Sequence, residues 1–312
     1  MNVEQFVKIC KMPQVELKKY LFKKLRKSHG EVEWRDGFLY AKGDFPVLLV
    51  AHMDTVHKET VNTVICDRDT GKISSPQGIG GDDRCGIYMI LEIVKRYNCS
   101  VLFCEDEEVG GVGATKFTKS ECSKDVNANY IIELDRKGNT DAVFYSCDNP
   151  EFTDFICKEY FKEAYGTFSD ISVVAPHLGL AAVNLSSGYY NAHTTSEYVV
   201  EQDINRILTE VFGLLDRTDE TKFEYIEEKY ESKWLTPKSK YYAKSVYTLE
   251  TYEIEYTDED GKTDYAFVEG DSEDEALFEF LLEHDGIPYR NVLCITCHGD
   301  LSDWGVVGSY VR

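Results

Sequence analysis

Residues 45–56 read FPVLLVAHMDTV, and this stretch decides the fold that the rest of the chain completes. Phe45 to Val50 is a continuous apolar run with a β-branched end, which is typical of a strand buried on both faces of a sheet. His52 and Asp54 follow this run directly. Ligands of open α/β sheets bind outside the carboxyl ends of the strands, so we expect functional side chains at this strand end.

The same pattern of buried strands and helices continues along the chain. Short apolar runs predict further strands at Val101–Cys104, Tyr130–Leu134 and Ala181–Leu185. Helical spacing of apolar residues predicts helices over 3–27, 83–97, 152–164 and 202–215. Strands that alternate with helices predict an α/β domain, with a mostly parallel mixed sheet sandwiched by helices, over residues 1–217.

The composition changes after this domain. Residues 218–242 are rich in Glu, Lys and Tyr, which predicts a charged helix or linker. Residues 243–312 carry two alternating runs, an Asp260-Gly261 turn, a capping spacing from Ser272 and a last apolar run, which together predict a small ββαβ (α+β) accessory module. Residues 250–283 hold 14 acidic residues and a single base. We interpret these acids as a solvated coat, with docking of a partner as the alternative.

Charge and composition exclude several classes of partner. The 312 residues carry a formal net charge of -22, which opposes binding to nucleic acid or an anionic membrane surface. No apolar run is long enough to span a bilayer, and the charged amino-terminal segment differs from a signal peptide. The ten cysteines lack disulfide-framework spacing, so we expect a cytoplasmic protein. The C-x-x-C-H string at 294–298 matches covalent haem attachment, but we interpret it as a chance match within a predicted strand.

Polar residues follow each of the predicted strands. Glu107 and Glu108 follow the second strand, Asp135 follows the third, and His193 lies beyond the fourth. Asp82 precedes the helix that connects the first two strands. The carboxyl ends of parallel strands meet at one edge of a sheet, so these side chains should converge there.

Acids gathered in one cleft repel each other unless cations neutralise them. Histidine together with Asp and Glu is a ligand set that suits Zn²⁺, with Mn²⁺ or Co²⁺ as alternatives. Two metals need one bridging carboxylate and two further ligands each, a number that is met by His52, Asp82, Glu108, Asp135 and His193. Glu107 is then a free carboxylate beside a ligand, which is the arrangement of a general base.

Five motifs between residues 47 and 200 resemble, in this order, the co-catalytic zinc exopeptidases of the M20 and M28 type, and most closely the peptidase T-like branch of M20. They are AHMDTV (51–56), GIGGDDRCG (78–86), EDEEVGG (105–111), IIELDRKG (131–138) and YYNAHTTSEYV (189–199). The resemblance implies a zinc-exopeptidase-like fold and two bound metals.

The resemblance also implies a role for each matching residue. One metal is held by His52 with Asp135, the other by Glu108 with His193, and Asp82 bridges the two. Glu107 is implied as the general base. Asp54 is implied as the acid that fixes the tautomer and orientation of His52. Asp83 is adjacent to the bridging position, and the family spacing assigns that role to Asp82.

The chain also departs from the family. M20 members usually insert a lid or dimerisation domain between the third metal acid and the last histidine, whereas here Asp135 and His193 are 58 residues apart. We therefore expect a catalytic domain without a lid. A proline often follows the HxDTV motif, but this chain has His57, which could line the pocket and which we interpret as an exposed loop histidine.

Three further residues are candidates for substrate binding. Asp170, in a stretch that also resembles the family, could order the site or contact a substrate amine, or could cap a turn. Gly188 and Tyr190 lie where the backbone would approach a substrate, or could serve packing alone.

These features predict a two-metal hydrolase of amide bonds, most directly a zinc aminopeptidase acting on short peptides. The alternative within hydrolases is an N-acyl amino acid deacylase or small carboxypeptidase, in which Arg84 or Arg136, both beside ligands, would meet the substrate carboxylate. A metal-dependent binding or scaffold protein without turnover is an alternative of another class. The presence of Glu107 and Asp54 argues against it.

Overall fold

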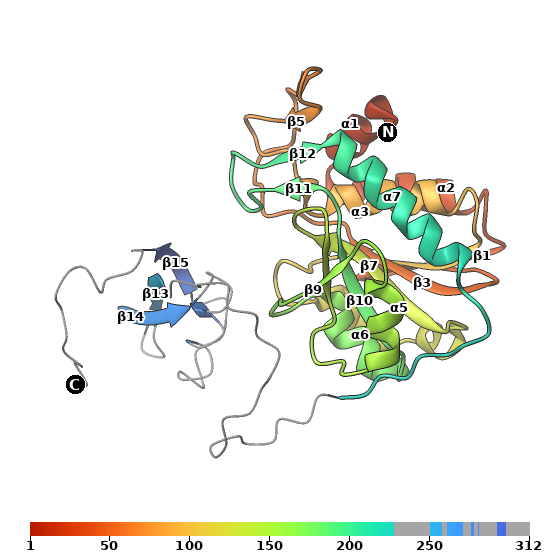
Figure 1. Cartoon of the computed structure of the whole chain (residues 1–312). Helices are drawn as coiled ribbons and strands as arrows, with labels where there is room; N and C mark the ends of the chain where they lie inside the picture. Colours follow the sequence, from red (N-terminus) through yellow and green to blue (C-terminus); the bar gives the residue numbers. More distant parts are fainter. Residues whose placement is uncertain (228–249, 258–260, 271–275, 278–279, 281–291, 298–312) are drawn as a thin grey trace, which may run out of the picture. The chain divides into compact units, whose positions relative to one another are not determined.

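The structure is a computed structural model that describes residues 1–227, 250–257, 261–270, 276–277, 280 and 292–297. The chain divides into two compact units, Met1–Lys229 and Tyr230–Arg312 (Figure 1). Among the described residues, no helix has both the length and the apolar character that crossing a membrane requires.

The first unit is built on an eight-stranded mixed sheet, in the order β1-β2-β6-β3-β7-β10-β8-β9. The central strands β6, β3, β7 and β10 are parallel, as the sequence predicts. The strands are β1 (Glu31–Arg35), β2 (Phe38–Lys42), β3 (Phe45–His52), β6 (Cys99–Cys104), β7 (Tyr130–Arg136), β8 (Asp141–Val143), β9 (Lys162–Ala164) and β10 (Ala182–Ser186). A second sheet is formed by β11 (Tyr189–Tyr190), β12 (Tyr198–Val200), β5 (Lys72–Ser74) and β4 (Ile65–Asp67).

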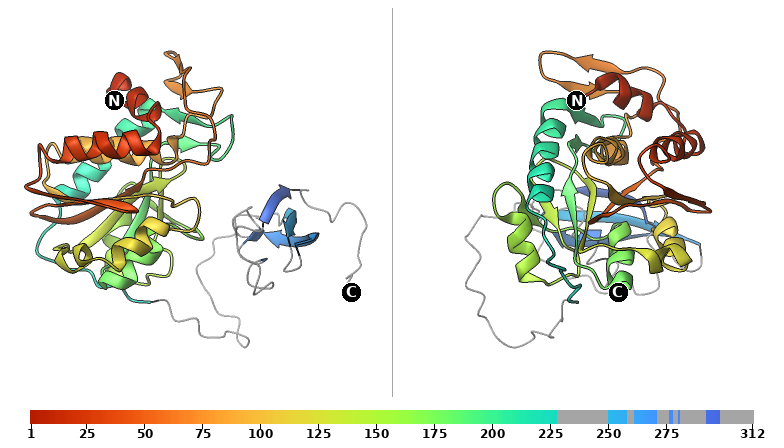
Figure 2. Two further views of the ribbon diagram at one scale, coloured as in Figure 1. Left: turned by 180° about the vertical axis from the view of Figure 1, so that it is seen from behind. Right: turned by 90° about the vertical axis from the view of Figure 1, so that its right-hand side faces the viewer.

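Helices cover both faces of the large sheet (Figure 2). One face carries α1 (Val3–Cys10), α2 (Gln14–Leu25), α3 (Gly81–Ile93) and α7 (Glu201–Asp216). The other face carries α4 (Val112–Thr118), the 3-10 helix η1 (Glu121–Asp125) and α6 (Asp170–Leu178). The helix α5 (Pro150–Cys157) packs Phe152 and Ile156 into the same core as α3 and α7. Residues 136–192, all of them described, belong to the first unit and form no separate lid domain.

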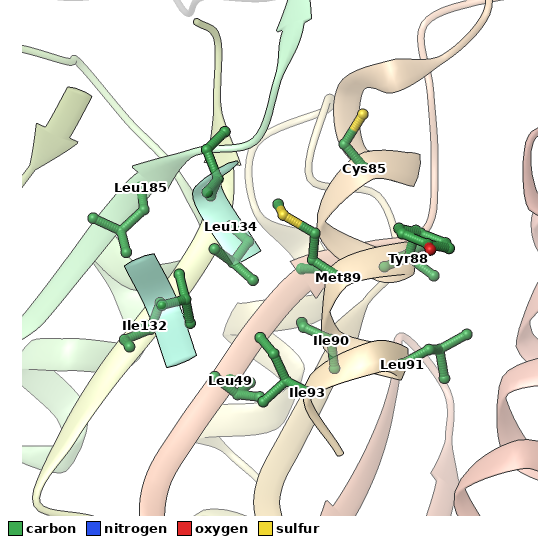
Figure 3. Packing of buried hydrophobic residues seen from close by; sticks show 14 of the residues in the cluster. Leu49, Cys85, Tyr88, Met89, Ile90, Leu91, Ile93, Ile132, Leu134 and Leu185 are labelled. Carbon is green, nitrogen blue, oxygen red and sulfur yellow. The ribbon is translucent and has the colours of Figure 1, made fainter. Parts of the chain in front are cut away.

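Strand β3 is buried on both faces because its side chains alternate between two hydrophobic cores. Val47 and Leu49 join the core beneath α3, whereas Leu48 and Val50 join the core beneath α4 and α6. Leu49 belongs to the same core as side chains of α3 and of the neighbouring strands, which Figure 3 shows with Met89, Ile90, Ile93, Ile132, Leu134 and Leu185. The continuous apolar run in the sequence therefore reflects two-sided burial.

Two predicted helices differ from the structure. The stretch 3–27 forms two helices, because Pro13 has no backbone N–H to continue α1 and instead precedes α2. The helix predicted over 152–164 ends at Cys157. Residues 162–164 form the edge strand β9, which pairs in parallel with β8. Phe161 is buried in the core, so tertiary burial and strand pairing override the helical pattern here.

The segment 218–242 is predicted as a charged helix or linker; residues 218–227 contain no helix, and the remainder lies outside the described residues. The described part extends along the first unit: the Ala181 N–H donates to Phe223 O, and the Phe223 N–H donates to Asn129 O. The ring of Phe223 packs among Tyr130, Phe152 and Phe155. The contacts of the Phe223 ring stabilise an extended conformation in this segment, for which the composition predicts a helix or a linker.

The second unit contains an antiparallel sheet in the order β14-β13-β15. Its strands are β13 (Glu250–Thr257), β14 (Thr263–Gly270) and β15 (Val292–Cys297), which match the strands predicted for this region. Tyr252, Ile254 and Val268 lie in a small core with Phe280. The helix predicted after Ser272 lies largely outside the described residues, as does His298 of the C-x-x-C-H string.

Truncation of Leu49 tests the packing of β3. Leu49→Ala should lower the free energy of unfolding by about 2–5 kcal/mol, because it leaves a cavity between β3 and α3. Ile65→Ala is the control, since Ile65 is 53% exposed and its truncation should change stability by less than about 0.5 kcal/mol. Urea unfolding measures both, and equal effects would contradict the assigned core.

Candidate active site

The large sheet brings predicted ligands and the predicted general base to one edge. His52 is the last residue of β3, and Asp135 lies near the end of the adjacent parallel strand β7. Glu107 and Glu108 lie in the turn that follows β6, the parallel neighbour of β3 on its other side. The carboxyl ends of three neighbouring parallel strands therefore supply four of these side chains.

Asp82 lies between two histidines that come from opposite ends of the first unit's sequence. Its Oδ1 is 3.0 Å from His52 Nε2, and its Oδ2 is 3.2 Å from His193 Nε2. Asp135 Oδ1 is 3.5 Å from His52 Nε2, and Glu108 Oε2 is 3.3 Å from His193 Nε2. Asp82 thus contacts His52 through one carboxylate oxygen and His193 through the other.

These two groups fit two cations. In each group, one potential ligand atom per residue lies within 4.8 Å of the others; the groups are His52, Asp82 and Asp135, and Asp82, Glu108 and His193. Asp135 Oδ1 and Glu108 Oε1 are buried and have no hydrogen-bond partner among the described residues. Buried oxygens without donors are suited to a cation, and a mixed set of nitrogen and carboxylate ligands is one that Zn²⁺ accepts.

Asp82 and Asp83 have different tasks, although they are adjacent and joined by a cis peptide bond. The side chain of Asp83 accepts hydrogen bonds from the backbone N–H groups of His52 (3.3 Å) and Gly86 (2.9 Å). Burial, followed by the charge of Asp135, raises the pKa of Asp83 well above its usual value. Asp83 therefore holds the backbone at His52 and Gly86, whereas the carboxylate of Asp82 contacts His52 and His193.

Asp54 connects the first histidine to the turn that carries the two glutamates. Its Oδ1 lies 3.2 Å from His52 Nδ1, the ring nitrogen that faces away from Asp82. The two oxygens of Asp54 also accept the backbone N–H groups of Glu107 and Glu108, each at 3.1 Å. A carboxylate in this position fixes the tautomer of His52, so that Nε2 is free to bind a metal.

The charges of the site are strongly coupled. Burial, and then the charge of Asp82, raises the pKa of Asp135 to about 8. Burial opposes ionisation of Asp82, but hydrogen bonds with His193 and His52 hold its pKa below the usual value. Hydrogen bonds with Asp82 and Glu108 raise the pKa of His193 to about 11. The cluster therefore favours positive charge next to Asp82 and disfavours additional negative charge.

Glu107 belongs to neither ligand group. Burial raises its pKa well above the usual value, and the charges of Asp135, Asp170 and Glu108 act in the same direction. A carboxyl group with a raised pKa beside a metal site binds a proton more readily than an exposed carboxylate does. This is the property that a general base requires.

The three candidates for substrate binding lie outside both ligand groups. Asp170 is fully buried at the start of α6, and burial raises its pKa to about 7. Tyr190 donates its hydroxyl to Asp203 and stacks on Tyr198. Gly188 has a positive φ of 88°, and a Cβ there would lie 2.9 Å from Ile204. Tyr190 and Gly188 thus have contacts within the first unit, whereas both carboxylate oxygens of Asp170 are buried without a hydrogen-bond partner among the described residues.

One acid near the site, Glu197, is not predicted from the sequence, and the environment of His57 differs from the prediction. Glu197 is fully buried, and its Oε2 lies 2.7 Å from His57 Nε2. The side chain of His57 is only 9% exposed, so its interpretation as an exposed loop histidine is wrong. The reason is the distant Glu197, which pairs with it across 140 residues of chain. The one sequence feature that pointed to Glu197 was its position four residues after His193. This spacing does not reveal that Glu197 contacts His57.

Arg84 is a structural residue in this fold. Its guanidinium is buried and donates to Met53 O (2.6 Å) and Met12 O (3.2 Å), which joins the α1–α2 connection to the end of β3. Arg136 lies 3.5 Å from Asp141. The backbone contacts of Arg84 leave it poorly placed to bind the carboxylate of a substrate.

Paired substitutions separate the tasks of the two aspartates. Asp82→Asn should strongly reduce zinc uptake, because it removes the shared ligand, while preserving the fold. Asp83→Asn should retain zinc uptake but lower the free energy of unfolding by about 1–3 kcal/mol, because one backbone N–H loses its acceptor. Metal content and urea unfolding measure the two effects, and the opposite pattern would assign the bridging role to Asp83.

The stability of the chelated protein should depend on pH. The usual pKa of Asp135 is 3.8 and its folded-state pKa is about 8, so the folded state keeps a proton that the unfolded chain has released. The free energy of unfolding in EDTA should therefore fall as pH rises from about 4 to 8. Thermal unfolding across this range measures the trend, and Asp135→Asn should flatten it. Constant or rising stability would contradict the assigned burial of charge.

No protein-family model and no curated protein sequence matches the chain. Solved structures do match it. They include aminopeptidase PepT from Bacillus cereus (TM-score 0.57, 16% identity, 69% of this chain and 97% of that chain). A second match is a tripeptidase from Staphylococcus aureus (TM-score 0.54, 14% identity, 68% of this chain and 96% of that chain). A third is a Zn-dependent exopeptidase from Parabacteroides distasonis (TM-score 0.51, 15% identity, 69% of this chain and 96% of that chain). At these identities the likeness shows the fold alone: the chain has the mixed α/β fold of these peptidases, as predicted.

Proposed function

We propose that this chain is a two-metal exopeptidase, most directly a zinc aminopeptidase that acts on short peptides. The observation that carries the proposal is the placement of Asp82, whose two oxygens face His52 and His193 in separate ligand groups. The solved structures of similar fold include an aminopeptidase, a tripeptidase and a Zn-dependent exopeptidase, which supports the same reaction class.

One divalent cation would be held by His52 and Asp135, and the other by Glu108 and His193. Asp82 would be a ligand of both cations. Zinc fits this set, and Mn²⁺ or Co²⁺ could take the same ligands. When bound, such a pair of cations supplies an acidified water and polarisation of the scissile carbonyl. The surrounding residues hold the ligands in place: Asp54 orients His52, and Asp83 anchors the backbone on either side of the site.

Glu107 would move the proton during hydrolysis. Its backbone N–H is fixed by Asp54, so its side chain starts from a defined position beside Glu108. The carboxylate of Glu107 would accept a proton from the attacking water and deliver it to the leaving nitrogen. Its raised pKa suits both halves of this transfer.

The charge of the site favours a substrate with a free amine. Asp54, Glu107 and the acidic ligands place several carboxylates at the site, whereas the guanidinium of Arg84 donates to backbone carbonyls. A substrate carboxylate would therefore find less support than a substrate ammonium. This comparison favours an aminopeptidase over an N-acyl amino acid deacylase or a small carboxypeptidase. A binding protein without turnover would have no use for the positioned Glu107.

Turnover by the Glu107→Gln variant tests the proposal. The variant should take up the same amount of zinc as the unaltered protein, because Glu107 is not a ligand, while turnover of short peptides should fall by about 100-fold or more. The assay uses matched peptides with free and blocked amino termini, and only the free peptides should be cleaved. Glu59→Gln changes an exposed carboxylate in the loop after β3 and serves as the control. Full activity of Glu107→Gln, or cleavage of blocked peptides alone, would contradict the proposal.

A further inference from the structure

Glu197 is a buried carboxylate with three hydrogen-bonding contacts and no assigned task. Its Oε1 accepts the backbone N–H of Asp82 at 3.0 Å, and its Oε2 accepts the backbone N–H of Gly80 at 2.8 Å. The same Oε2 lies 2.7 Å from Nε2 of His57. A carboxylate only accepts, so Nε2 of His57 is the donor.

These contacts join three segments that each carry a group of the candidate site. His57 lies in the loop that continues from His52 and Asp54. Gly80 leads into Asp82 at the start of α3, and Glu197 lies four residues after His193. Glu197 is thus a buried point of connection between segments that are far apart in sequence.

The backbone at Asp82 depends on such an external contact. Asp82 has a φ of -80° and a ψ of 103°, which are not helical, and Gly80 has a left-handed φ of 65°. The hydrogen-bond ladder of α3 therefore does not fix the N–H of Asp82, and Glu197 accepts it instead. The hydrogen bond to Glu197 therefore holds the backbone of Asp82, from which its carboxylate extends toward the two histidines.

Close packing holds both members of the pair in place. A Cβ at Gly78 would lie 2.2 Å from Cε1 of His57, so the absence of a side chain at Gly78 lets the ring lie against the backbone. A Cβ at Gly81 would lie 2.7 Å from the Cβ of Tyr189 and 3.3 Å from Oε1 of Glu197. The two glycines thus permit the close approach of His57 and Glu197 beside Asp82.

We propose that His57 and Glu197 form a positioning pair that sets the metal affinity of the site by holding Asp82 between the two ligand groups. The inference rests on the proposed two-metal function. Neither residue contacts the reacting atoms. The pair acts through the backbone of Asp82, in the way that outer residues around a metal site orient its ligands.

Zinc affinity of folded variants tests the pair. Glu197→Gln keeps the shape of the side chain but replaces one acceptor by an amide donor, and His57→Ala removes the donor. Competition with a chromophoric chelator should show zinc affinity about 10- to 100-fold weaker in both variants. His57→Gln, whose amide can donate to Glu197, should lose less affinity than His57→Ala. Activity of the variants should recover in excess zinc, because Glu107 is unchanged.

His29→Gln is the matched control. His29 is also buried and hydrogen-bonded, with Nε2 at 2.8 Å from Cys99 O, but Cys99 begins β6 at the edge opposite the site. This variant should lose stability and keep the zinc affinity of the unaltered protein. A purely structural role of the pair would instead weaken zinc binding equally in His29→Gln and His57→Ala.

The outcomes separate the inference from the proposed function. Unaltered zinc affinity in His57→Ala and in Glu197→Gln, or an equal loss in the His29→Gln control, would overturn the positioning pair alone. Should Glu197→Gln fail to fold, the two His57 variants still decide the result. If the unaltered protein takes up no divalent metal, the proposed function fails and the inference fails with it.

Discussion

Repulsion between buried carboxylates is the constraint on which the site depends. Asp82, Asp135 and Glu108 converge at the carboxyl edge of a parallel sheet, where little solvent can screen their charges. Burial and proximity raise the pKa of Asp135, while His52 and His193 act in the opposite direction on Asp82. The pair of divalent cations proposed for this site would relieve the same repulsion more completely.

The scaffold resists this repulsion with two kinds of support. Strands β3 and β7 place His52 and Asp135 rigidly, because both strands are buried on their two faces by α3 on one side and by α4 and α6 on the other. The groups carried by loops are held by hydrogen bonds that their backbone N–H groups donate to further carboxylates. Asp54 fixes the turn of Glu107 and Glu108, Asp83 fixes the end of β3, and Glu197 fixes Asp82. Carboxylates that are not metal ligands thus position the backbone of the residues that are proposed as ligands.

The sequence predicted the parts of this arrangement that follow from strand order. Continuous apolar runs such as Phe45–Val50 are readable as two-sided burial, and residues that follow parallel strands meet at one edge whatever the loops do. The convergence of His52, Asp82, Asp135, Glu108 and His193 was therefore accessible without coordinates. The division of tasks between Asp82 and Asp83 rested on family spacing and is visible physically only in the hydrogen bonds of Asp83.

Features that depend on distant contacts could not be predicted in this way. The edge strand β9 takes its conformation from pairing with β8, although its sequence continues a helical pattern. The extended chain at Phe223 depends on an aromatic cluster formed by residues far away in sequence. His57 is buried only because Glu197 reaches it from the other end of the first unit's sequence. Local periodicity carries no information on such pairs.

Anomalous X-ray diffraction at the zinc edge, on crystals of the full chain grown with zinc, shows whether Asp82 lies between two metal ions. We expect two peaks about 3.5–4 Å apart, one on each side of the Asp82 carboxylate, with Glu107 outside the ligand shell of both. A single peak, no peak, or a peak coordinated by Asp83 would contradict it.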